Sequence, residues 1–342
     1  MSEASEQEAP PNPPHDHVPL ETVDVAIFGI AIRTSLWLGL CESLASTNDC
    51  SFKIFFCGPN RPNFPLPENL VYIHSEMAPA ACAEIARRLA LAEGAEYTMD
   101  MPDDFVPDPH LLDTLIRELE QIEGEAVVAP AFRPSLKQAA INVSSDPDRV
   151  GRAGEVINLA MMKCSTAQKM GGVDRRFVGL CFAYDQLMRL EELGNITFKV
   201  CGNITVAENS GIQRTGVPGG TRLSVRYGNN DRTLWISLWD HTPVAGLRRG
   251  QFKMPKFDYP PRRKDDVQLY DEADLTYTVY TSEGGDVTPA KMPLPSPSPP
   301  SPPAPPPPHT FTTPFQHARA QTPAEELLEQ RDAACRKARR NR

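Results

Sequence analysis

The 342-residue sequence contains no apolar run of the roughly 18 to 20 residues that a membrane-spanning helix requires. It also lacks an excess of positive charge, because 35 Lys and Arg stand against 44 Asp and Glu, for a formal net charge of −9. Nucleic-acid phosphates are bound by clustered Lys and Arg, so this balance argues against a nucleic-acid-binding protein. The first residues are acidic and rich in proline, so we do not expect a signal peptide.

The eight cysteines show none of the spacings that are typical of a zinc site or a disulfide framework. Several of them, such as Cys57, Cys181 and Cys201, lie within apolar runs. This pattern predicts reduced, buried thiols in a cytoplasmic protein. With 40% hydrophobic residues, the chain is long enough to bury one large core and at most a small appendage.

Composition divides the chain into five parts. We expect a disordered acidic tail at residues 1–20 and one large folded domain, of the size of a catalytic domain, at residues 21–225. Residues 226–292 are expected to pack on that domain as an extension. Residues 293–309 are a proline tract typical of a stiff polyproline II linker, and residues 310–342 form a tail that contains a short surface helix or a partner-binding segment. Such proline tracts are frequent in algal proteins and in viruses of algae, which hints at the source.

Apolar strand patterns alternate with helical patterns through the larger domain. The nearly continuous apolar runs at residues 23–32 and 52–56 are typical of strands that are buried on both faces, and amphipathic helices follow them. This alternation predicts a doubly wound, mostly parallel α/β sheet. Such sheets bind ligands at the carboxyl ends of their strands, where Arg33, Gly58 and an acidic stretch all fall.

Three carboxylates make up the acidic stretch, at Asp100, Asp103 and Asp104, directly after a strand pattern. Carboxylates that crowd a strand end repel one another. A hard divalent cation such as Mn²⁺ or Mg²⁺ relieves this repulsion and commonly bridges to the phosphates of a substrate. The alternative is a solvated acidic turn that precedes the next helix.

The acidic stretch and the segment after it, Val106-Pro107-Asp108-Pro109 and then Leu111-Leu112, resemble the metal-binding turn of GT-A-fold glycosyltransferases of the family-two type. Several moderate motifs in the family's order extend the resemblance over about residues 23–209, a little over half of the chain. It implies a GT-A, nucleotide-diphospho-sugar transferase-like domain with a C-terminal extension. It also implies a nucleotide-sugar donor, a glycan or glycoconjugate acceptor, and Mn²⁺ or Mg²⁺ as the cofactor.

The chain departs from the family at the metal-binding turn. Asp104 aligns with the second metal-site aspartate, but Pro102 stands where the first is expected, so Asp103 or Asp100 would supply the missing oxygen. The family often completes this site with a histidine after the last strand, where this chain has Glu208. The resemblance therefore implies Asp103, Asp104 and Glu208 as metal ligands.

The resemblance also implies a set of residues that contact the donor. Arg33 and Gly58 follow the first two strands, Arg87 lies in the helix before the acidic stretch, and Asp103 lies in the stretch itself. The aspartate that often follows the second strand in the family is absent, and Cys57-Gly58-Pro59 stands there instead. The identity of the nucleotide base is therefore open.

An acceptor-side loop is implied at Gly171, Gly172 and Asp174, where the order Gly-Gly-apolar-Asp resembles a second family signature. Paired glycines permit a close approach of the backbone, although they can also simply end a helix. In inverting members, a carboxylate near the start of the next helix acts as the general base. Asp185 is the carboxylate available there, and the alternative is a structural ion pair with Arg189, one turn later.

The C-terminal extension contains two tryptophans and a strand pattern. We expect Trp235 and Trp239 to cover the core rather than to stack on a sugar, and residues 275–281 to add an edge strand. For the whole chain, the leading hypothesis is a metal-dependent, inverting glycosyltransferase. A catalytically inactive GT-A-fold module that binds carbohydrate or nucleotide is the alternative. A nucleotidyltransferase would share the sheet, but residues 29–33 are a poor phosphate loop.

Overall fold

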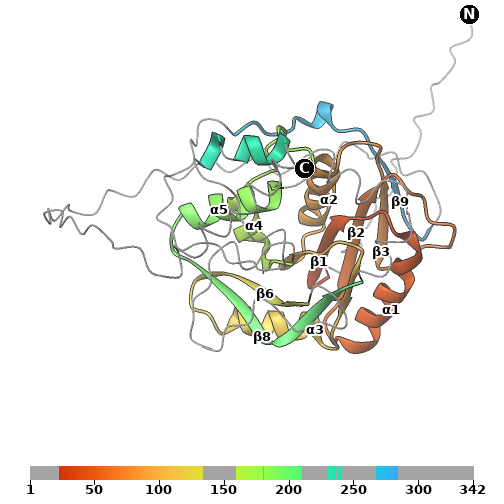
Figure 1. The fold of residues 1–342 in the computed structure, drawn as a ribbon. Helices are drawn as coiled ribbons and strands as arrows, with labels where there is room; N and C mark the ends of the chain where they lie inside the picture. Colours follow the sequence, from red (N-terminus) through yellow and green to blue (C-terminus); the bar gives the residue numbers. More distant parts are fainter. Residues whose placement is uncertain are drawn as a thin grey trace, which may run out of the picture. The chain divides into compact units, whose positions relative to one another are not determined.

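The computed structural model describes six segments of the chain, drawn as coloured ribbons in Figure 1. They are residues 23–133, 159–179, 181–209, 230–235, 237–239 and 267–283. The predicted tail at residues 1–20, the proline linker at 293–309 and the tail at 310–342 lie outside these segments. The boundaries proposed for those parts therefore stay predictions.

One mixed sheet of nine strands runs through the described residues, in the order β5-β8-β6-β7-β4-β1-β2-β3-β9. Four adjacent strands of this sheet run parallel to one another: β1 (Val25–Ile30), β2 (Phe52–Gly58), β3 (Leu70–His74) and β4 (Tyr97–Asp100). The chain places β2 and β3 on one side of β1 and then returns to place β4 on the other side. The strand order thus reverses between β1 and β4, and open α/β sheets bind ligands at the carboxyl end of such a switch point.

The other strands of the sheet mix parallel and antiparallel pairing. They are β5 (Phe105–Pro107), β6 (Glu125–Arg133), β7 (Met161–Lys163), β8 (Ile196–Glu208) and, at the opposite edge, β9 (Thr278–Tyr280). Strands β6 and β8 are parallel to each other, whereas β5, β7 and β9 each pair antiparallel with their neighbours. The predicted mostly parallel α/β sheet is confirmed.

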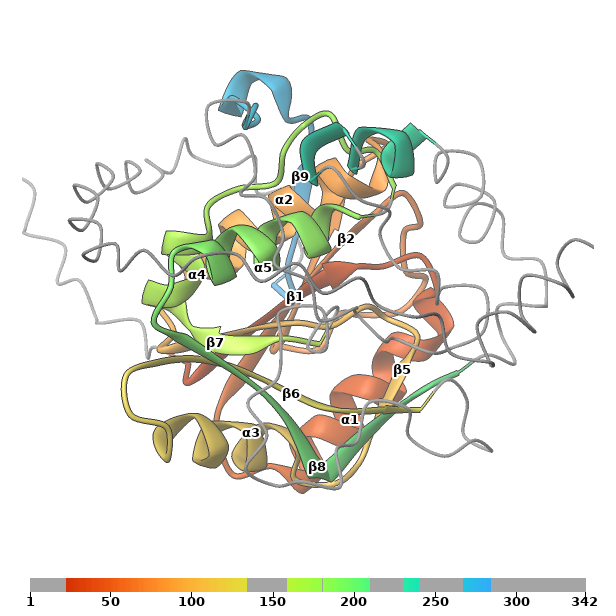
Figure 2. The same ribbon diagram turned by 60° about the vertical axis from the view of Figure 1, so that its left-hand side comes forward.

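Helices cover both faces of this sheet, as Figures 1 and 2 show. One face carries α1 (Trp37–Thr47), which follows the short helix η1 (Thr34–Leu36), and α3 (Leu111–Glu120). The other face carries α2 (Pro79–Ala92), α4 (Cys164–Met170) and α5 (Phe182–Glu192). A short helix, η4 (Glu272–Asp274), precedes β9.

The alternation of side chains along β1 explains why both faces are apolar. Val25 and Ile27 enter the core beneath α1 and α3, whereas Ala26 and Phe28 enter the core beneath α2. Successive side chains of a strand point to opposite faces, so a strand that is covered on both sides needs apolar residues at nearly every position. The continuous apolar run in the sequence has this structural cause.

The described parts of the C-terminal extension pack on the domain. Trp235 and Trp239 are buried in the core beneath α5, at 0% and 1% exposure, so the prediction that they cover the core is confirmed. The predicted edge strand is also confirmed, because β9 pairs antiparallel with β3. Within the segments that the structure describes, we find no helix with the length and apolarity that crossing a bilayer requires.

Candidate functional site

The carboxyl ends of β1 and β4 approach each other closely at the switch point. The backbone of Met101 donates from its N–H to the carbonyl oxygen of Phe28 at 2.9 Å. A Cβ at Gly29 would lie only 2.2 Å from the carbonyl oxygen of Met101, so a side chain at this position has no room. Glycine in β1 thus allows the acidic stretch to cross directly over the end of the strand.

Asp103 is the residue that organises the loop after β1. It is fully buried, and its Oδ2 accepts hydrogen bonds from the backbone N–H of Ile32 at 2.7 Å, from the backbone N–H of Arg33 and from Nε1 of Trp37 at 2.9 Å. Its Oδ1 accepts from Nη1 of Arg33 at 3.0 Å. Burial raises the pKa of Asp103, and the bonds from Trp37 and Arg33 oppose this effect. The carboxylate fixes the path of the chain from β1 into α1.

Asp104 shares the same guanidinium group. Its Oδ2 lies 3.2 Å from Nη2 of Arg33, and its carbonyl oxygen accepts a hydrogen bond from the backbone N–H of Asn209 at 2.8 Å. Arg33 therefore bridges Asp103 and Asp104, with 11% of its side chain exposed. The predicted donor-binding arginine and two of the predicted metal ligands do come together.

Asp100 ends β4 and differs from the other two carboxylates. It has no hydrogen-bond or ion-pair partner for its side chain among the described residues, and its carboxyl group is buried although part of the residue is exposed. Burial alone raises the pKa of Asp100 from its usual 3.8 to about 7. We call Arg33, Asp100, Asp103 and Asp104 the strand-end cluster.

The predicted donor residue Gly58 lies at the end of β2, beside this cluster. A Cβ at Gly58 would lie 2.0 Å from the carbonyl oxygen of Ala31, which gives the glycine a packing reason independent of any ligand. Asn60 follows, and its Nδ2 donates to the carbonyl oxygen of Ile32 at 2.7 Å. These contacts hold the loops after β1 and β2 against each other.

The three predicted metal ligands are not gathered around one point. Glu208 lies on β8, opposite Phe105 of β5, and we find no contact among the described residues between its side chain and Asp103 or Asp104. Among the segments that the structure describes, no three His, Cys, Asp or Glu side chains form a group that could hold a metal ion. The guanidinium of Arg33 lies where a cation shared by Asp103 and Asp104 would lie. In this arrangement the residues do not fit a divalent ion.

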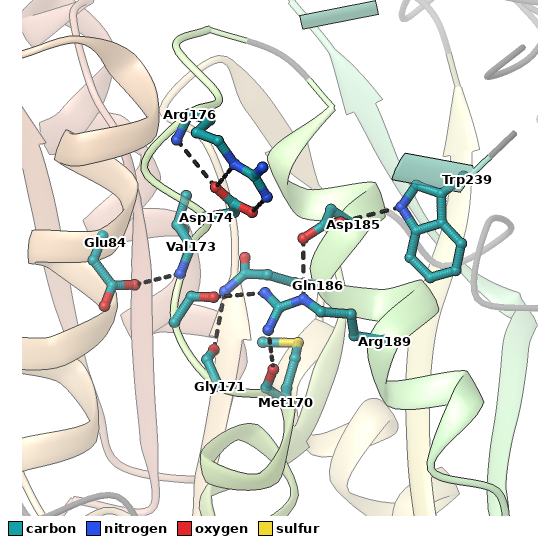
Figure 3. A network of polar contacts seen from close by, with 11 residues as sticks. Glu84, Met170, Gly171, Val173, Asp174, Arg176, Asp185, Gln186, Arg189 and Trp239 are labelled. Carbon is teal, nitrogen blue, oxygen red and sulfur yellow. Dashed lines mark hydrogen bonds and ion pairs between the residues drawn. The ribbon is translucent and has the colours of Figure 1, made fainter. Parts of the chain in front are cut away.

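A second group of charged residues lies on the α2, α4 and α5 face (Figure 3). Glu84 of α2 is 1% exposed and accepts hydrogen bonds from Arg87, from Arg88 and from the backbone N–H of Val173 at 3.0 Å. Burial acts to raise the pKa of Glu84, but the two arginines outweigh this effect and hold it below its usual value. The predicted donor residue Arg87 is thus buried at 7% exposure in a pair with Glu84, on a different element from the strand-end cluster.

The predicted acceptor-side loop is attached to this group. Gly171 ends α4 with a φ of 76°, a conformation that favours glycine. A Cβ at Gly172 would lie 2.8 Å from Oε1 of Glu84, so glycine is needed for the contact between the loop and α2. Asp174 is fully buried and forms an ion pair with Arg176 at 2.6 Å. The sequence alternative, in which the glycines end a helix, holds for Gly171.

Asp185, the predicted general base, lies in the first turn of α5 and is fully buried. Its Oδ2 accepts from Nε of Arg189 at 3.0 Å, and its Oδ1 accepts from Nε1 of Trp239 at 3.1 Å (Figure 3). The structural pair with Arg189, which the sequence left open, is present. Arg189 also donates to the carbonyl oxygens of Met170 and Gly172. The base role of Asp185 stays a prediction, and its burial stands against that role.

We call this group, part of which Figure 3 shows, the helix-face network. Its charged members are Glu84, Arg87, Arg88, Asp174, Arg176, Asp185 and Arg189. Sequence reasoning missed its centre, Glu84, although Arg87 and Arg88 follow at the spacing of three and four residues that pairs side chains on a helix. It also missed Trp37 as the partner of Asp103, for which the sequence offers no local signal.

Comparison with known proteins gives a partial structural likeness. No protein-family model and no curated protein matches the sequence. The crystal structure of S. aureus TarS matches with 9% identity and a TM-score of 0.42 over 54% of this chain and 36% of that chain. A crystal structure of GalNAc-T7 with UDP, GalNAc and Mn²⁺ matches with 8% identity and a TM-score of 0.39 over 55% of this chain and 44% of that chain. This chain thus spans less than half the length of either structure.

Proposed function

We propose that this chain is a glycosyltransferase that binds a nucleotide-sugar donor at the strand-end cluster and transfers the sugar to a hydroxyl group of a glycan or glycoconjugate. The cluster lies at the carboxyl ends of β1 and β4, where the strand order reverses. Open α/β sheets bind their ligands at this place. The sequence resemblance to GT-A-fold glycosyltransferases, carried by the acidic stretch, supports the same location.

The observation that carries the proposal is the side chain of Asp100. A carboxylate with a pKa raised to about 7 and no partner among the described residues makes the ligand-free protein less stable at neutral pH. Groups of this kind concentrate at functional sites, where a ligand supplies the missing partner. A sugar or ribose hydroxyl group, which donates a hydrogen bond, is a suitable partner for Asp100.

The other residues of the cluster position the donor. Asp103 holds the backbone of Ile32 and Arg33, so the loop after β1 has one conformation before any ligand arrives. Such preorganisation lowers the entropy that binding costs. Because the described ligand set does not fit a divalent ion, the role of Mn²⁺ or Mg²⁺ in donor binding stays a prediction, as does inversion at the anomeric carbon.

A second candidate function is binding without turnover. The burial of Asp185 against Arg189 and Trp239 favours it, because an inverting transferase needs a carboxylate that reaches the hydroxyl group of the acceptor. Under this alternative, the strand-end cluster binds a nucleotide or a carbohydrate and no sugar is transferred.

The first experiment is a thermal-shift screen of sugar nucleotides, with Mn²⁺ and with a chelator. A ligand that binds only the folded state raises the Tm by mass action, so one donor should give a selective rise. Asp104→Asn should abolish that rise. Glu123→Gln is the matched control, since it removes one exposed negative charge before β6, at the amino end of the parallel strands. If no sugar nucleotide raises the Tm, the proposal is wrong.

The second experiment separates transfer from binding. The donor that raises the Tm is incubated with mixed glycan acceptors, and the release of nucleoside diphosphate is followed. Release that depends on the acceptor supports the transferase. A donor that binds but is not consumed with any acceptor supports the binding module.

A further inference from the structure

We infer that the guanidinium group of Arg33 is the resident cation of the strand-end cluster, and that a divalent cation binds Asp104 only by displacing it. This inference concerns metal binding by the chain itself. It does not depend on whether the protein transfers a sugar.

Two distances support a resident cation. Nη1 of Arg33 lies 3.0 Å from Oδ1 of Asp103, and Nη2 lies 3.2 Å from Oδ2 of Asp104. The remaining oxygen of Asp103 already accepts hydrogen bonds from two backbone N–H groups and from Trp37, 2.9 Å away. Each carboxylate therefore contacts one terminal nitrogen of the same rigid, planar cation, and the several N–H donors of arginine suit such a bridge.

Co-occupation by a metal ion is unfavourable on electrostatic grounds. Mg²⁺ binds carboxylate oxygen at about 2.1 Å, so an ion on Oδ2 of Asp104 would lie within about 5 Å of Nη2 of Arg33. The side chains of Arg33, Asp103 and Asp104 are at most 11% exposed, so little water screens the repulsion between a metal ion and the guanidinium group at this distance. The metal and the guanidinium compete for Asp104.

The loop does not need the Arg33 side chain to keep its shape. Asp103 accepts hydrogen bonds from the backbone N–H groups of Ile32 and Arg33. Any residue at position 33 except proline keeps both of these donors. Replacing the side chain alone should leave this loop in place and remove the guanidinium group that contacts both carboxylates. Arg33→Gln therefore tests the competition directly.

The experiment measures Mn²⁺ binding to the full chain at pH 8 without nucleotide, by calorimetry and by the rise in Tm. Arg33→Gln should bind Mn²⁺ about tenfold more tightly than the parent chain, or more, because a positive charge near the ion is removed. Its Tm without metal should be lowered and should recover with Mn²⁺. Arg61→Gln is the matched control, since Arg61 is exposed and contacts the ring of Tyr280 instead.

Two further variants decide the outcome. Arg33→Gln combined with Asp104→Asn should lose the gained affinity, because the negative charge and one of the two carboxylate oxygens that attract the metal are removed. Arg33→Lys keeps a positive charge and should bind Mn²⁺ as weakly as the parent chain does; this variant serves if Arg33→Gln does not fold without metal. The inference is overturned if Arg33→Gln gains no affinity, if the double variant keeps the gain, or if Arg33→Lys gains as much.

Discussion

The strand-end cluster and the helix-face network contain similar residues and differ in how these are paired. In the network, each carboxylate faces at least one guanidinium, as Glu84 faces Arg87 and Arg88. In the cluster, the guanidinium of Arg33 contacts both Asp103 and Asp104. Asp100 has no partner among the described residues. A buried group with its charges matched supports the fold, whereas a group with an unmatched carboxylate is suited to a ligand.

The two groups also differ in the elements that they join. The network connects α2 and α5 to the loop at residues 171–174, on the face of the sheet that carries α2, α4 and α5. The cluster connects the ends of two neighbouring strands at the switch point. This comparison predicts that substitutions in the network mainly lower stability and that substitutions in the cluster mainly change ligand binding.

The largest loss of stability is expected for Glu84→Ala. Removing one partner of a buried ion pair leaves its cations uncompensated and typically costs about 3 to 5 kcal/mol. Here Arg87 and Arg88 lose their carboxylate, and the N–H of Val173 loses its acceptor. Urea denaturation measures the effect. Glu93→Ala, which breaks a more exposed pair with Lys53, should cost about 1 kcal/mol or less. Equal losses in both variants would contradict the comparison.

The next largest effect is expected for Asp185→Asn, at about 2 to 4 kcal/mol of stability, because the buried guanidinium of Arg189 loses its counter-charge. The amide can still accept a hydrogen bond from Trp239, which limits the loss. Arg189→Met should also lower stability, since the buried carboxylate of Asp185 then loses the guanidinium group that contacts it. A variant that is as stable as the parent chain but at least about a hundredfold slower in sugar transfer would instead support Asp185 as the general base.

Asp100→Asn should raise stability, and the gain should depend on pH. The folded protein keeps the proton of Asp100 up to a pKa of about 7, whereas the unfolded chain loses it near 3.8. Between these values the folded state binds more protons, so the stability of the parent chain falls as the pH rises from about 4 to about 7. The variant cannot ionise at this position. We expect it to be about 1 to 3 kcal/mol more stable at pH 8 and unchanged at pH 3, in urea denaturation at both pH values. Lower stability at pH 8 would show that Asp100 has a favourable partner.

The smallest loss of stability is expected for Asp104→Asn, because Arg33 keeps its pair with Asp103 and the amide keeps one oxygen that can accept a hydrogen bond. The rise in Tm caused by a sugar nucleotide should nevertheless disappear. Together with Glu84→Ala, this variant separates the two groups: one should lose ligand binding without unfolding, and the other should lose stability. A donor response that survives Asp104→Asn would place the donor elsewhere.

Much of the fold could be predicted from the sequence, because it depends on local patterns. The run at residues 23–32 is apolar at nearly every position, and such a run is compatible with a strand that is covered on both faces. The acidic stretch identified the switch-point end of β4 in the same way, since adjacent carboxylates are visible without any knowledge of their surroundings. The tryptophans of the extension and its edge strand were equally evident from residue type.

The assignment of roles within the charged residues was decided by the tertiary structure. Asp103 looks like a metal ligand beside Asp104 in the sequence, but Ile32, Arg33 and Trp37, about seventy residues earlier, surround it in the fold. Asp185 looks like a base at the start of a helix, but a tryptophan from the extension occupies one of its oxygens. The free energy of ionising a carboxyl group depends on the charges and hydrogen-bond donors within a few ångströms of it, and these come from distant parts of the chain. Sequence alone therefore located the carboxylates, and only the packing decided which of them are left for a ligand.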